Sequence, residues 1–373
     1  MKFLIITHVD HIEKANNLYG YAPYVREMNI WLKYIDELII VAPLSSKRNL
    51  TEVDTFYNFQ NIDFREISSF NFKKLSDALI SLLKLPIIFW KIFWAMKESD
   101  HIHLRCPGNV GLIGCLAQIF FPKKIKTAKY AGNWDPRSKQ PFSYRLQKWI
   151  LNNTFLTRNM QVLVYGDWEK QSKNIKSFFT ATYSESEKEI ITKTGLKSSI
   201  DFMFVGSLVS GKNPLYAIKL IEKLLEKERK VILNIYGEGS EKENLQNYVQ
   251  QNHLQDFIVF HGNESKETIK EAYQKSHFVI LPSKSEGWPK AIAEAMFWGC
   301  IPVASKVSCV PSMLDFGNRG ILLEMDLNQD VKQIENLIAV ENNYKSKSTL
   351  SQDWSQYYTL ELFESEIKKL LFK

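Results

Sequence analysis

The sequence predicts an α/β protein with two doubly wound domains, each built on a parallel β-sheet. Short apolar runs that end in turn residues alternate with helical-period segments along the whole chain, which is typical of βα units. The length of 373 residues suits two domains. The hydrophobic fraction of 45% is that of a globular chain with a sizeable core, so a disordered or collagenous protein is excluded.

The first half is expected to form one domain over residues 1–181. Its first apolar run is too short for a secretory signal and is interpreted as the first strand. The expected strands are Lys2–Thr7, Glu37–Ala42, His101–Leu104, Lys126–Ala131 and Gln161–Tyr165, and the expected helices are Leu75–Lys97, Val110–Phe120 and Phe142–Asn152.

The second half is expected to form a domain over residues 200–352. A polar segment, 182–199, is interpreted as the linker, and an amphipathic helix at 353–373 can cross back to the N-terminal domain. The expected strands are Asp201–Val205, Val231–Tyr236, Ile258–His261, Phe278–Leu281 and Ile301–Ala304, and the helices are Pro214–Glu228, Glu241–Asn252, Lys266–Lys275 and Lys290–Trp298.

Charge is distributed unevenly along the chain. Residues 1–180 carry 25 basic and 15 acidic residues, whereas residues 181–373 carry 23 and 26. The first half should therefore prefer an anionic partner: a membrane surface, a nucleic acid or a phosphorylated substrate. Nucleic acid is disfavoured, because no recognisable binding module is present and the acidic half would repel it. The four cysteines have neither zinc-site spacing nor disulfide density, which favours a reducing cytoplasm.

The apolar, aromatic stretch Ser76–Met96 has two interpretations. Two lysines and a proline interrupt it, so it makes a poor transmembrane span. It can be a buried crossover helix, or an interfacial helix at the inner face of a membrane. The lysines that would flank an interfacial helix are Lys73, Lys74 and Lys97.

Ligands of doubly wound sheets bind outside the carboxyl ends of the strands, so the loops there are the candidate site. After the strand 201–205 come Gly206 and Gly211, which let the backbone approach a ligand, and Lys212, which can neutralise a phosphate beside a helix N-terminus. A plain glycine turn with a solvated lysine is the alternative. After the strand 231–236, Gly237 and Gly239 repeat the arrangement.

The third loop holds two glutamates, Glu286 before a glycine turn and Glu294 eight residues later in the following helix. Two helical turns separate them, so they can contact different parts of one extended ligand. The free amides of residues 288–291, less that of Pro289, offer an anion site between them. A nucleotide sugar, with hydroxyls at both ends and phosphate in the middle, fits. The alternative is that Glu286 caps the helix and Glu294 is exposed.

These elements occur in the order of a known family. The matching positions are Gly206, Leu208 and Lys212, then Gly237 and Gly239, then Glu286 and Glu294, followed by the Gly-Cys-Ile-Pro-Val-Ala-Ser run 299–305. Residues 200–325 resemble the donor domain of the retaining GT-B glycosyltransferases of family 4, the glycosyl transferases group 1 type. The resemblance implies a GT-B fold, with two facing Rossmann-like domains and a cleft between them.

The resemblance also implies roles for these residues. Glu294 would hold the ribose hydroxyls, Lys212 would neutralise the diphosphate, and Glu286 with the amides after Gly287 would grip the transferred sugar. Lys212 and Glu286 would both act in catalysis. Preorganised positive charge and amides stabilise the leaving diphosphate. The implied donor-binding positions are Gly206, Ser207, Lys212, Gly237, Gly239, Gly287, Trp288, Pro289, Lys290, Ala291 and Glu294.

Two positions depart from the family pattern. Ser207 stands where an arginine is usual, and Lys290 could supply the missing charge. Pro289 comes two positions early, which alters the turn. In the first half the family places the acceptor on the loops after the early strands, and a histidine that often contacts the sugar there has no clear equivalent. The acceptor candidates are Tyr21, Arg105, Asn109 and Asn133, with Asp135 as a further catalytic candidate.

The predicted function is retaining transfer of a hexose-type sugar from a UDP- or GDP-sugar to a glycan or lipid-linked glycan, in capsule, exopolysaccharide or O-antigen biosynthesis. No cofactor is expected beyond the nucleotide-sugar substrate, and no DxD-type motif stands out, so metal independence is predicted. The expected location is the cytoplasm, with peripheral contact to an anionic membrane. A GT-B epimerase or phosphorylase and a non-catalytic partner subunit are the alternatives.

Overall fold

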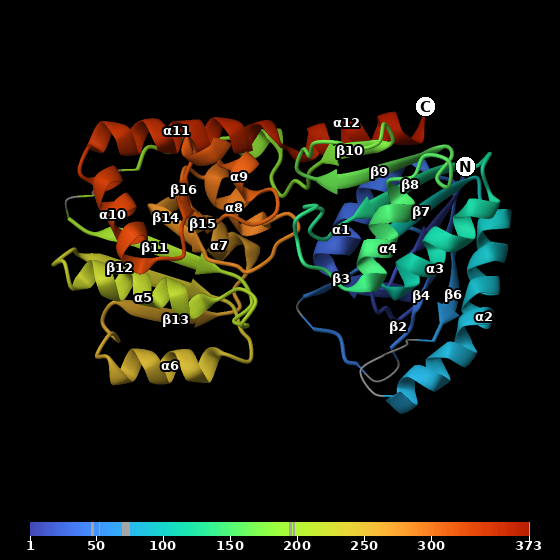
Figure 1. The fold of residues 1–373 in the computed structure, drawn as a ribbon, viewed down its shortest axis with the longest axis horizontal. Coiled ribbons are helices and arrows are strands. Elements are labelled where there is room, and N and C mark those ends of the chain that lie inside the picture. Colours follow the sequence, from blue (N-terminus) through green and yellow to red (C-terminus); the bar gives the residue numbers. More distant parts are fainter. Residues whose placement is uncertain (46–47, 52, 69–74, 194–195, 197, 373) are drawn as a thin grey trace. The chain divides into compact units, whose positions relative to one another are not determined.

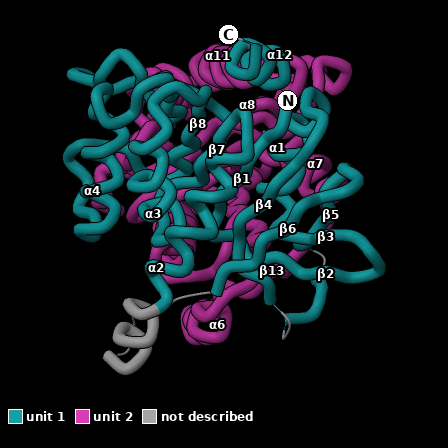
Figure 2. Tube along the Cα trace, turned by 90° about the vertical axis from the view of Figure 1, so that its right-hand side faces the viewer, with its two compact units in different colours: residues 1–179, 363–373 teal, residues 180–362 magenta. Residues whose placement is uncertain are grey.

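The computed structural model describes residues 1–45, 48–51, 53–68, 75–193, 196 and 198–372. The chain divides into two compact units (Figures 1 and 2). Unit 1 contains Met1–Phe179 and Phe363–Lys373, and unit 2 contains Thr180–Leu362. The flanking residues Lys73 and Lys74 lie outside the described part of the chain.

Unit 1 alternates strands and helices. Its strands are β1 (Lys2–Ile6), β2 (Ile12–Lys14), β3 (Asn17–Tyr21), β4 (Glu37–Pro43), β5 (Asp54–Phe56), β6 (Ile62–Ile67), β7 (His101–Cys106), β8 (Ile125–Tyr130), β9 (Met160–Tyr165) and β10 (Ile175–Phe178). Its helices are α1 (Ala22–Trp31), α2 (Leu75–Glu98), α3 (Asn109–Ala117), α4 (Phe142–Leu151) and α12 (Leu360–Leu371), with 3-10 turns η1 (Leu32–Tyr34) and η2 (Gln118–Phe120).

The main sheet of unit 1 has seven parallel strands in the order β10-β9-β8-β7-β1-β4-β6. Its central strands are buried on both faces, as covered parallel strands are. Apolar side chains of α2, α3 and α4 pack with one face, among them Ile92, Ile113 and Ile150. On the other face Trp31 of α1 contacts Phe3 of β1, with ring centres 5.8 Å apart.

Several strands of unit 1 were missed by the sequence prediction. The edge strands β6 and β10 are only partly buried, so neither shows a continuous apolar run. Strands β2, β3 and β5 form a separate antiparallel sheet, and two of them are three residues long. Strands this short lie below the length at which alternation can be recognised.

Unit 2 has the same alternation. Its strands are β11 (Ile200–Val205), β12 (Val231–Tyr236), β13 (Ile258–Gly262), β14 (Phe278–Leu281), β15 (Ile301–Ser305) and β16 (Ile321–Leu323). Its helices are α5 (Pro214–Leu225), α6 (Lys242–Gln251), α7 (Lys266–Lys275), α8 (Lys290–Phe297), α9 (Val310–Met313), α10 (Leu327–Ile338) and α11 (Glu341–Tyr357), with 3-10 turns η3 (Glu185–Glu187) and η4 (Asp315–Gly317).

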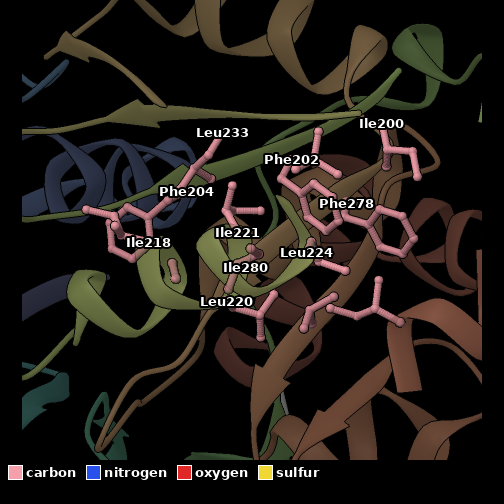
Figure 3. Packing of buried hydrophobic residues seen from close by; sticks show 14 of the residues in the cluster. Ile200, Phe202, Phe204, Ile218, Leu220, Ile221, Leu224, Leu233, Phe278 and Ile280 are labelled. Carbon is pink, nitrogen blue, oxygen red and sulfur yellow. The ribbon is translucent and has the colours of Figure 1, made fainter. Parts of the chain in front are cut away.

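The sheet of unit 2 is parallel, in the order β13-β12-β11-β14-β15-β16. Alternate residues of its central strands point to opposite faces. Phe202 and Phe278 stack at 4.8 Å within the core that α5 and α10 cover (Figure 3). Met203 and Val279 enter the opposite core, which α7 and α8 cover. The three-residue strand β16 was not predicted.

The C-terminal segment differs from the single helix expected over 353–373. Helix α11 ends at Tyr357 and α12 begins at Leu360. Thr359 separates them, because its hydroxyl accepts from the Leu362 amide at 3.4 Å and donates to Glu185 at 2.8 Å. From Phe363 onward the chain belongs to unit 1, whereas the expected linker, 182–199, falls within unit 2.

The predicted fold class is confirmed. Both units are α/β domains with parallel sheets and helices on the two faces, as in Rossmann-like folds. In both, the strand order reverses once, between β1 and β7 in unit 1 and between β11 and β14 in unit 2. These reversals locate the crevices where such sheets bind ligands.

Candidate functional site

The candidate donor site lies at the carboxyl edge of the unit 2 sheet. The three loops singled out in the sequence follow β11, β12 and β14, which are adjacent strands. Two of these loops flank the point where the strand order reverses. The topology therefore collects the three motifs in the part of the domain where ligands of doubly wound sheets bind.

The first two loops pack backbone against backbone. A Cβ on Gly237 would lie 2.0 Å from the carbonyl oxygen of Gly206, and one on Gly239 would lie 2.3 Å from that of Leu208. The Leu208 amide donates to the Glu238 carbonyl at 2.9 Å. Because no side chain fits at either contact, both glycines are required for this close approach.

The first and third loops are joined by charge and by hydrogen bonds. The Lys212 ammonium contacts the Glu286 carboxylate at 2.6 Å, and the residue Glu286 is 8% exposed. The Lys284 amide donates to the Gly211 carbonyl at 2.9 Å, and its ammonium lies 3.1 Å from the Ser210 hydroxyl oxygen. The structure thus brings together Lys212 and Glu286, the two predicted catalytic residues of this domain.

Local structure fixes both sides of this pair. Asn213 adopts the left-handed conformation, which turns the chain so that Pro214 can begin α5 with its fixed φ. On the other side the Gly287 carbonyl accepts from the Ser308 hydroxyl at 3.2 Å and from the Cys309 thiol at 3.3 Å. These hydrogen bonds from the segment after β15 therefore fix the turn that follows Glu286.

Glu294 lies within α8, and its carboxylate accepts from the Thr182 hydroxyl at 2.8 Å. Burial raises the pKa of Glu294, while the Thr182 hydrogen bond and the charges of Lys290 and Lys266 oppose the shift. A carboxylate kept in this desolvated position can accept hydrogen bonds from ligand hydroxyls. The residue is half-buried and hydrogen-bonded, so the alternative of an exposed surface glutamate is wrong.

A pocket within unit 2 opens beside Glu294. Its wall includes residues 180–183 and the aromatic side chains of Trp288, Trp354 and Tyr358. The rings of Trp288 and Trp354 stack with centres 6.3 Å apart, and Tyr358 lies 4.8 Å from Trp354. The N-terminal turn of α8 thus meets an aromatic wall supplied by the end of α11.

The two departures from the family pattern have clear positions. Ser207 is exposed on the first loop. A serine in place of the usual arginine therefore leaves no buried carboxylate without a partner at this position. Pro289 is buried and precedes α8, which begins at Lys290. Lys290 lies close enough to Glu294 to lower that carboxyl's pKa. Its charge is therefore directed toward the glutamate in this structure.

In unit 1, two acceptor candidates lie where that sheet reverses its order. Arg105, on β7, has its guanidinium 3.9 Å from the Glu27 carboxylate, and Lys129 reaches the same carboxylate at 3.8 Å. Asn109 begins α3 after Gly108, where a Cβ would lie 2.9 Å from Nδ1 of His8. Burial and the Arg105 charge lower the pKa of His8.

The other candidates of unit 1 have different surroundings. The Asn133 side chain accepts from the Asp135 amide at 2.9 Å, and the Asp135 carboxylate accepts from the Arg137 amide at 2.8 Å. Both side chains close local turns. Tyr21 is exposed at the end of β3, in the small antiparallel sheet.

Sequence reasoning missed several residues around the site. Thr182 falls in the segment interpreted as a linker, and Trp354 and Tyr358 fall in the C-terminal segment, which carried no motif. Glu27 lies on α1 and is buried beside two cations. These residues reach their sites through tertiary contacts far apart in the chain. Glu27 is of a residue type that is rarely buried, but its burial becomes visible only in the structure.

Two further observations concern the whole described chain. No helix in the described ranges has the length and apolarity needed to cross a membrane. Among those residues, no group of three or more histidine, cysteine and acidic side chains is arranged to hold a metal ion.

Comparison with known proteins agrees with the motifs. Residues 186–357 match the family model described as Glycosyl transferases group 1. An uncharacterized glycosyltransferase of Haemophilus influenzae is 31% identical over 45% of this chain and 47% of its own length. The lipopolysaccharide 1,6-galactosyltransferase of Escherichia coli is 29% identical over 30% of each chain. The match thus spans about half or less of the length of these relatives.

Solved structures share the fold over the complete chain. Anabaena HepE, solved with UDP and glucose, superposes with a TM-score of 0.69 at 15% identity, over 100% of this chain and 99% of its own. The lipopolysaccharide outer core galactosyltransferase WaaB gives 0.70 at 14% identity, over the same shares. These neighbours show the GT-B fold class. The motifs and the family match point the same way: residues 186–357 are similar to a Glycosyl transferases group 1 domain.

Proposed function

We propose that this protein is a retaining glycosyltransferase. It transfers a hexose-type sugar from a UDP- or GDP-sugar to a glycan or lipid-linked glycan. During transfer the bond between the sugar C1 and the diphosphate oxygen breaks, and a bond from C1 to an acceptor hydroxyl oxygen forms. The hydroxyl proton leaves with the diphosphate. The biosynthesis of a bacterial capsule, exopolysaccharide or O-antigen is the proposed setting.

The observation that carries the proposal is the Lys212–Glu286 pair across the strand-order reversal of unit 2. A leaving diphosphate gains negative charge as the C1–oxygen bond breaks, so a cation fixed beside it lowers the barrier. Glu286 holds the Lys212 ammonium in place and can itself accept hydrogen bonds from sugar hydroxyls. The two side chains thus serve the two ends of the bond that breaks.

Glu294 is the proposed ribose contact. Its carboxylate lies in the helix that the third loop opens, beside a pocket with an aromatic wall. The Thr182 hydroxyl donates to this carboxylate at 2.8 Å, which supports a role as an acceptor for hydroxyl groups. Ribose hydroxyls can make the same hydrogen bond.

The names of the similar proteins support the donor and the setting. HepE was solved with UDP and glucose, and one curated relative is a lipopolysaccharide galactosyltransferase. Uridine diphosphate is therefore the first nucleotide to test. The proposed transfer needs no metal ion, because Lys212 and the amides at the start of α8 can take the charge of the diphosphate.

Binding is tested by calorimetry and thermal shift with UDP, GDP, ADP and CMP, each with magnesium and with EDTA. A nucleotide at 100 times its dissociation constant should stabilise the fold by about 2.7 kcal/mol. We expect a shift with one diphosphate that EDTA does not reduce. Absence of binding to both UDP and GDP would contradict the proposal, and binding only with magnesium would contradict the metal-free part.

Transfer is tested with the matching nucleotide sugars and a panel of glycan acceptors, read by diphosphate release and by NMR of the product's anomeric centre. Retention of the donor's α or β configuration is expected. The Glu286→Gln variant should keep its fold and lose turnover. If it turns over at the wild-type rate, Glu286 is not part of the machinery. Interconversion of the nucleotide sugar without an acceptor would favour an epimerase.

A further inference from the structure

The second half of helix α2 has large hydrophobic side chains both buried and exposed. There, Ile88 and Ile92 are buried against the sheet of unit 1. Ile87, Trp90 and Trp94 are 61%, 54% and 48% exposed. Their spacing of three and four residues places these three side chains in one stripe along the outer side of the helix.

The stripe continues onto the 3-10 turn η2, which follows α3. Phe93 lies 5.4 Å from Trp90 and 6.0 Å from Phe120, measured between ring centres. Phe120, at the end of η2, is itself 65% exposed. Ile87, Trp90, Phe93, Trp94 and Phe120 therefore form one contiguous surface, the aromatic patch.

Lysines border the aromatic patch. The Lys97 ammonium lies 4.5 Å from the centre of the Trp94 ring, so cation and ring share one surface. Lys91 is exposed on α2, where its ammonium donates to the Glu66 carbonyl at 2.7 Å, and Lys123 is exposed in the turn after η2. The one carboxylate at the end of α2, that of Glu98, is paired with Arg65. These lysines therefore place positive charge beside the patch, most directly at Trp94.

We propose that the aromatic patch docks unit 1 onto an anionic phospholipid surface. Tryptophan rings are stable at the boundary between headgroups and acyl chains, and lysines beside them meet the lipid phosphates. An exposed hydrophobic stripe with lysines beside it is typical of helices that lie in a membrane interface. The inference goes beyond the proposed transferase activity and does not depend on it.

Charge decides between a membrane and a second copy of this chain. A symmetric dimer would place the patch against itself, so the lysines of both copies would face one another across a small interface. An anionic bilayer neutralises those lysines instead. The same charge argument makes the binding salt-dependent, since screening weakens the lysine contacts.

The test is co-sedimentation of the full chain with vesicles of phosphatidylcholine, alone or with about 30 mol% phosphatidylglycerol. The wild type should bind the anionic vesicles, more weakly as sodium chloride rises. The Trp90→Ala/Trp94→Ala variant should lose about tenfold or more in partition coefficient. Trp149→Ala removes a tryptophan of unit 1 that is also exposed and should leave binding unchanged.

The contribution of the lysines beside the aromatic patch is tested with a second pair of variants. Lys97→Gln should weaken binding to anionic vesicles, whereas Lys230→Gln, at an exposed lysine of unit 2, should not. Thermal unfolding verifies that all variants fold. Equal sedimentation of the double tryptophan variant and the wild type overturns the proposal, as does failure of the wild type to bind anionic vesicles. A dimer that dissociates when Trp90 and Trp94 are replaced assigns the patch to a second copy and also overturns it.

Discussion

Lys212 and Glu286 are 74 residues apart in the chain, yet their charged groups lie 2.6 Å from each other. Each follows a different strand, and the two strands are neighbours where the sheet order reverses. The ion pair therefore joins the first loop to the third. A ligand phosphate placed here would meet an ammonium group that is already oriented. Binding would therefore cost little side-chain conformational entropy at Lys212.

Replacing Lys212 should affect both binding and stability. Lys212→Met leaves the buried Glu286 carboxylate without its cation, so the free energy of unfolding should fall by about 1–3 kcal/mol. Loss of a charge-assisted phosphate contact should raise the dissociation constant of the diphosphate by about tenfold or more. Calorimetry and urea unfolding measure the two effects. Lys230→Met, at an exposed lysine, is the control. Unchanged affinity in Lys212→Met would remove this lysine from the site.

Replacing either of two glycines of unit 2 by alanine should change the free energy of unfolding by very different amounts. At Gly237 the φ of 140° strains any side chain, and the new Cβ would lie 2.0 Å from a backbone oxygen. We expect Gly237→Ala to lower the free energy of unfolding by about 3 kcal/mol or more. Gly211 has open space around its Cβ position, so Gly211→Ala should stay within about 1 kcal/mol of the wild type. Denaturant titrations of both variants test the contrast. A Gly237→Ala variant as stable as the wild type would show that the two loops are not held together this closely.

Glu294 should make stability depend on pH. Burial raises its pKa above the unfolded value of 4.5, so the folded state binds the proton more tightly. Ionised Glu294 therefore destabilises the fold near neutral pH, and this cost disappears as the pH falls toward 4.5. The Glu294→Gln variant keeps an oxygen that can accept the hydrogen bond from the Thr182 hydroxyl. It should be more stable than the wild type at neutral pH, and this difference in the free energy of unfolding should shrink as the pH falls. Urea unfolding at several pH values measures it, and a gap that is constant with pH would contradict the argument.

The same substitution should reduce nucleotide affinity. A neutral amide is a weaker acceptor for ribose hydroxyls than a carboxylate. We expect the dissociation constant of the diphosphate to rise in Glu294→Gln while the protein becomes more heat-stable. A gain in stability with full affinity would place the ribose elsewhere.

The thiols should be unreactive in the folded protein. All four cysteines are free and buried, and burial raises the pKa of Cys300 to about 11 and that of Cys309 to about 12. Near neutral pH these thiols stay protonated, and the thiolate is the reactive form. Iodoacetamide followed by mass spectrometry should find no modified cysteine in the native protein and four after denaturation. Native labelling at Cys309 would mean that the segment beneath Gly287 opens.

Much of the donor site could be predicted because its residues lie in contiguous motifs. Gly237 and Glu286 were found from loops that directly follow strongly apolar strands, and parallel strands place such loops at one edge. The central strands were predicted for the same reason, since burial on both faces leaves unbroken apolar runs.

Other parts carry no local signal. The contact of Thr182 with Glu294 joins residues 112 positions apart, and the helix boundary at Thr359 depends on a hydrogen bond to Glu185. Thr182 and Thr359 both lie in segments where a threonine is common, so the sequence around them gives no sign of these contacts. Edge strands such as β6 are hidden for a related reason, because partial burial leaves mixed sequences.

The last helix makes unit 1 discontinuous in the chain. Phe363 of α12 packs against Phe178 and Phe179, with ring centres 5.5 and 5.7 Å away. On the ribosome, Phe363 follows only after residues 180–362 have been synthesised, on the order of ten seconds or more after Phe179. During that interval the nascent unit 1 presents two uncovered phenylalanines. Chaperones that hold emerging chains should therefore engage this protein at the end of β10, and release it when α12 arrives.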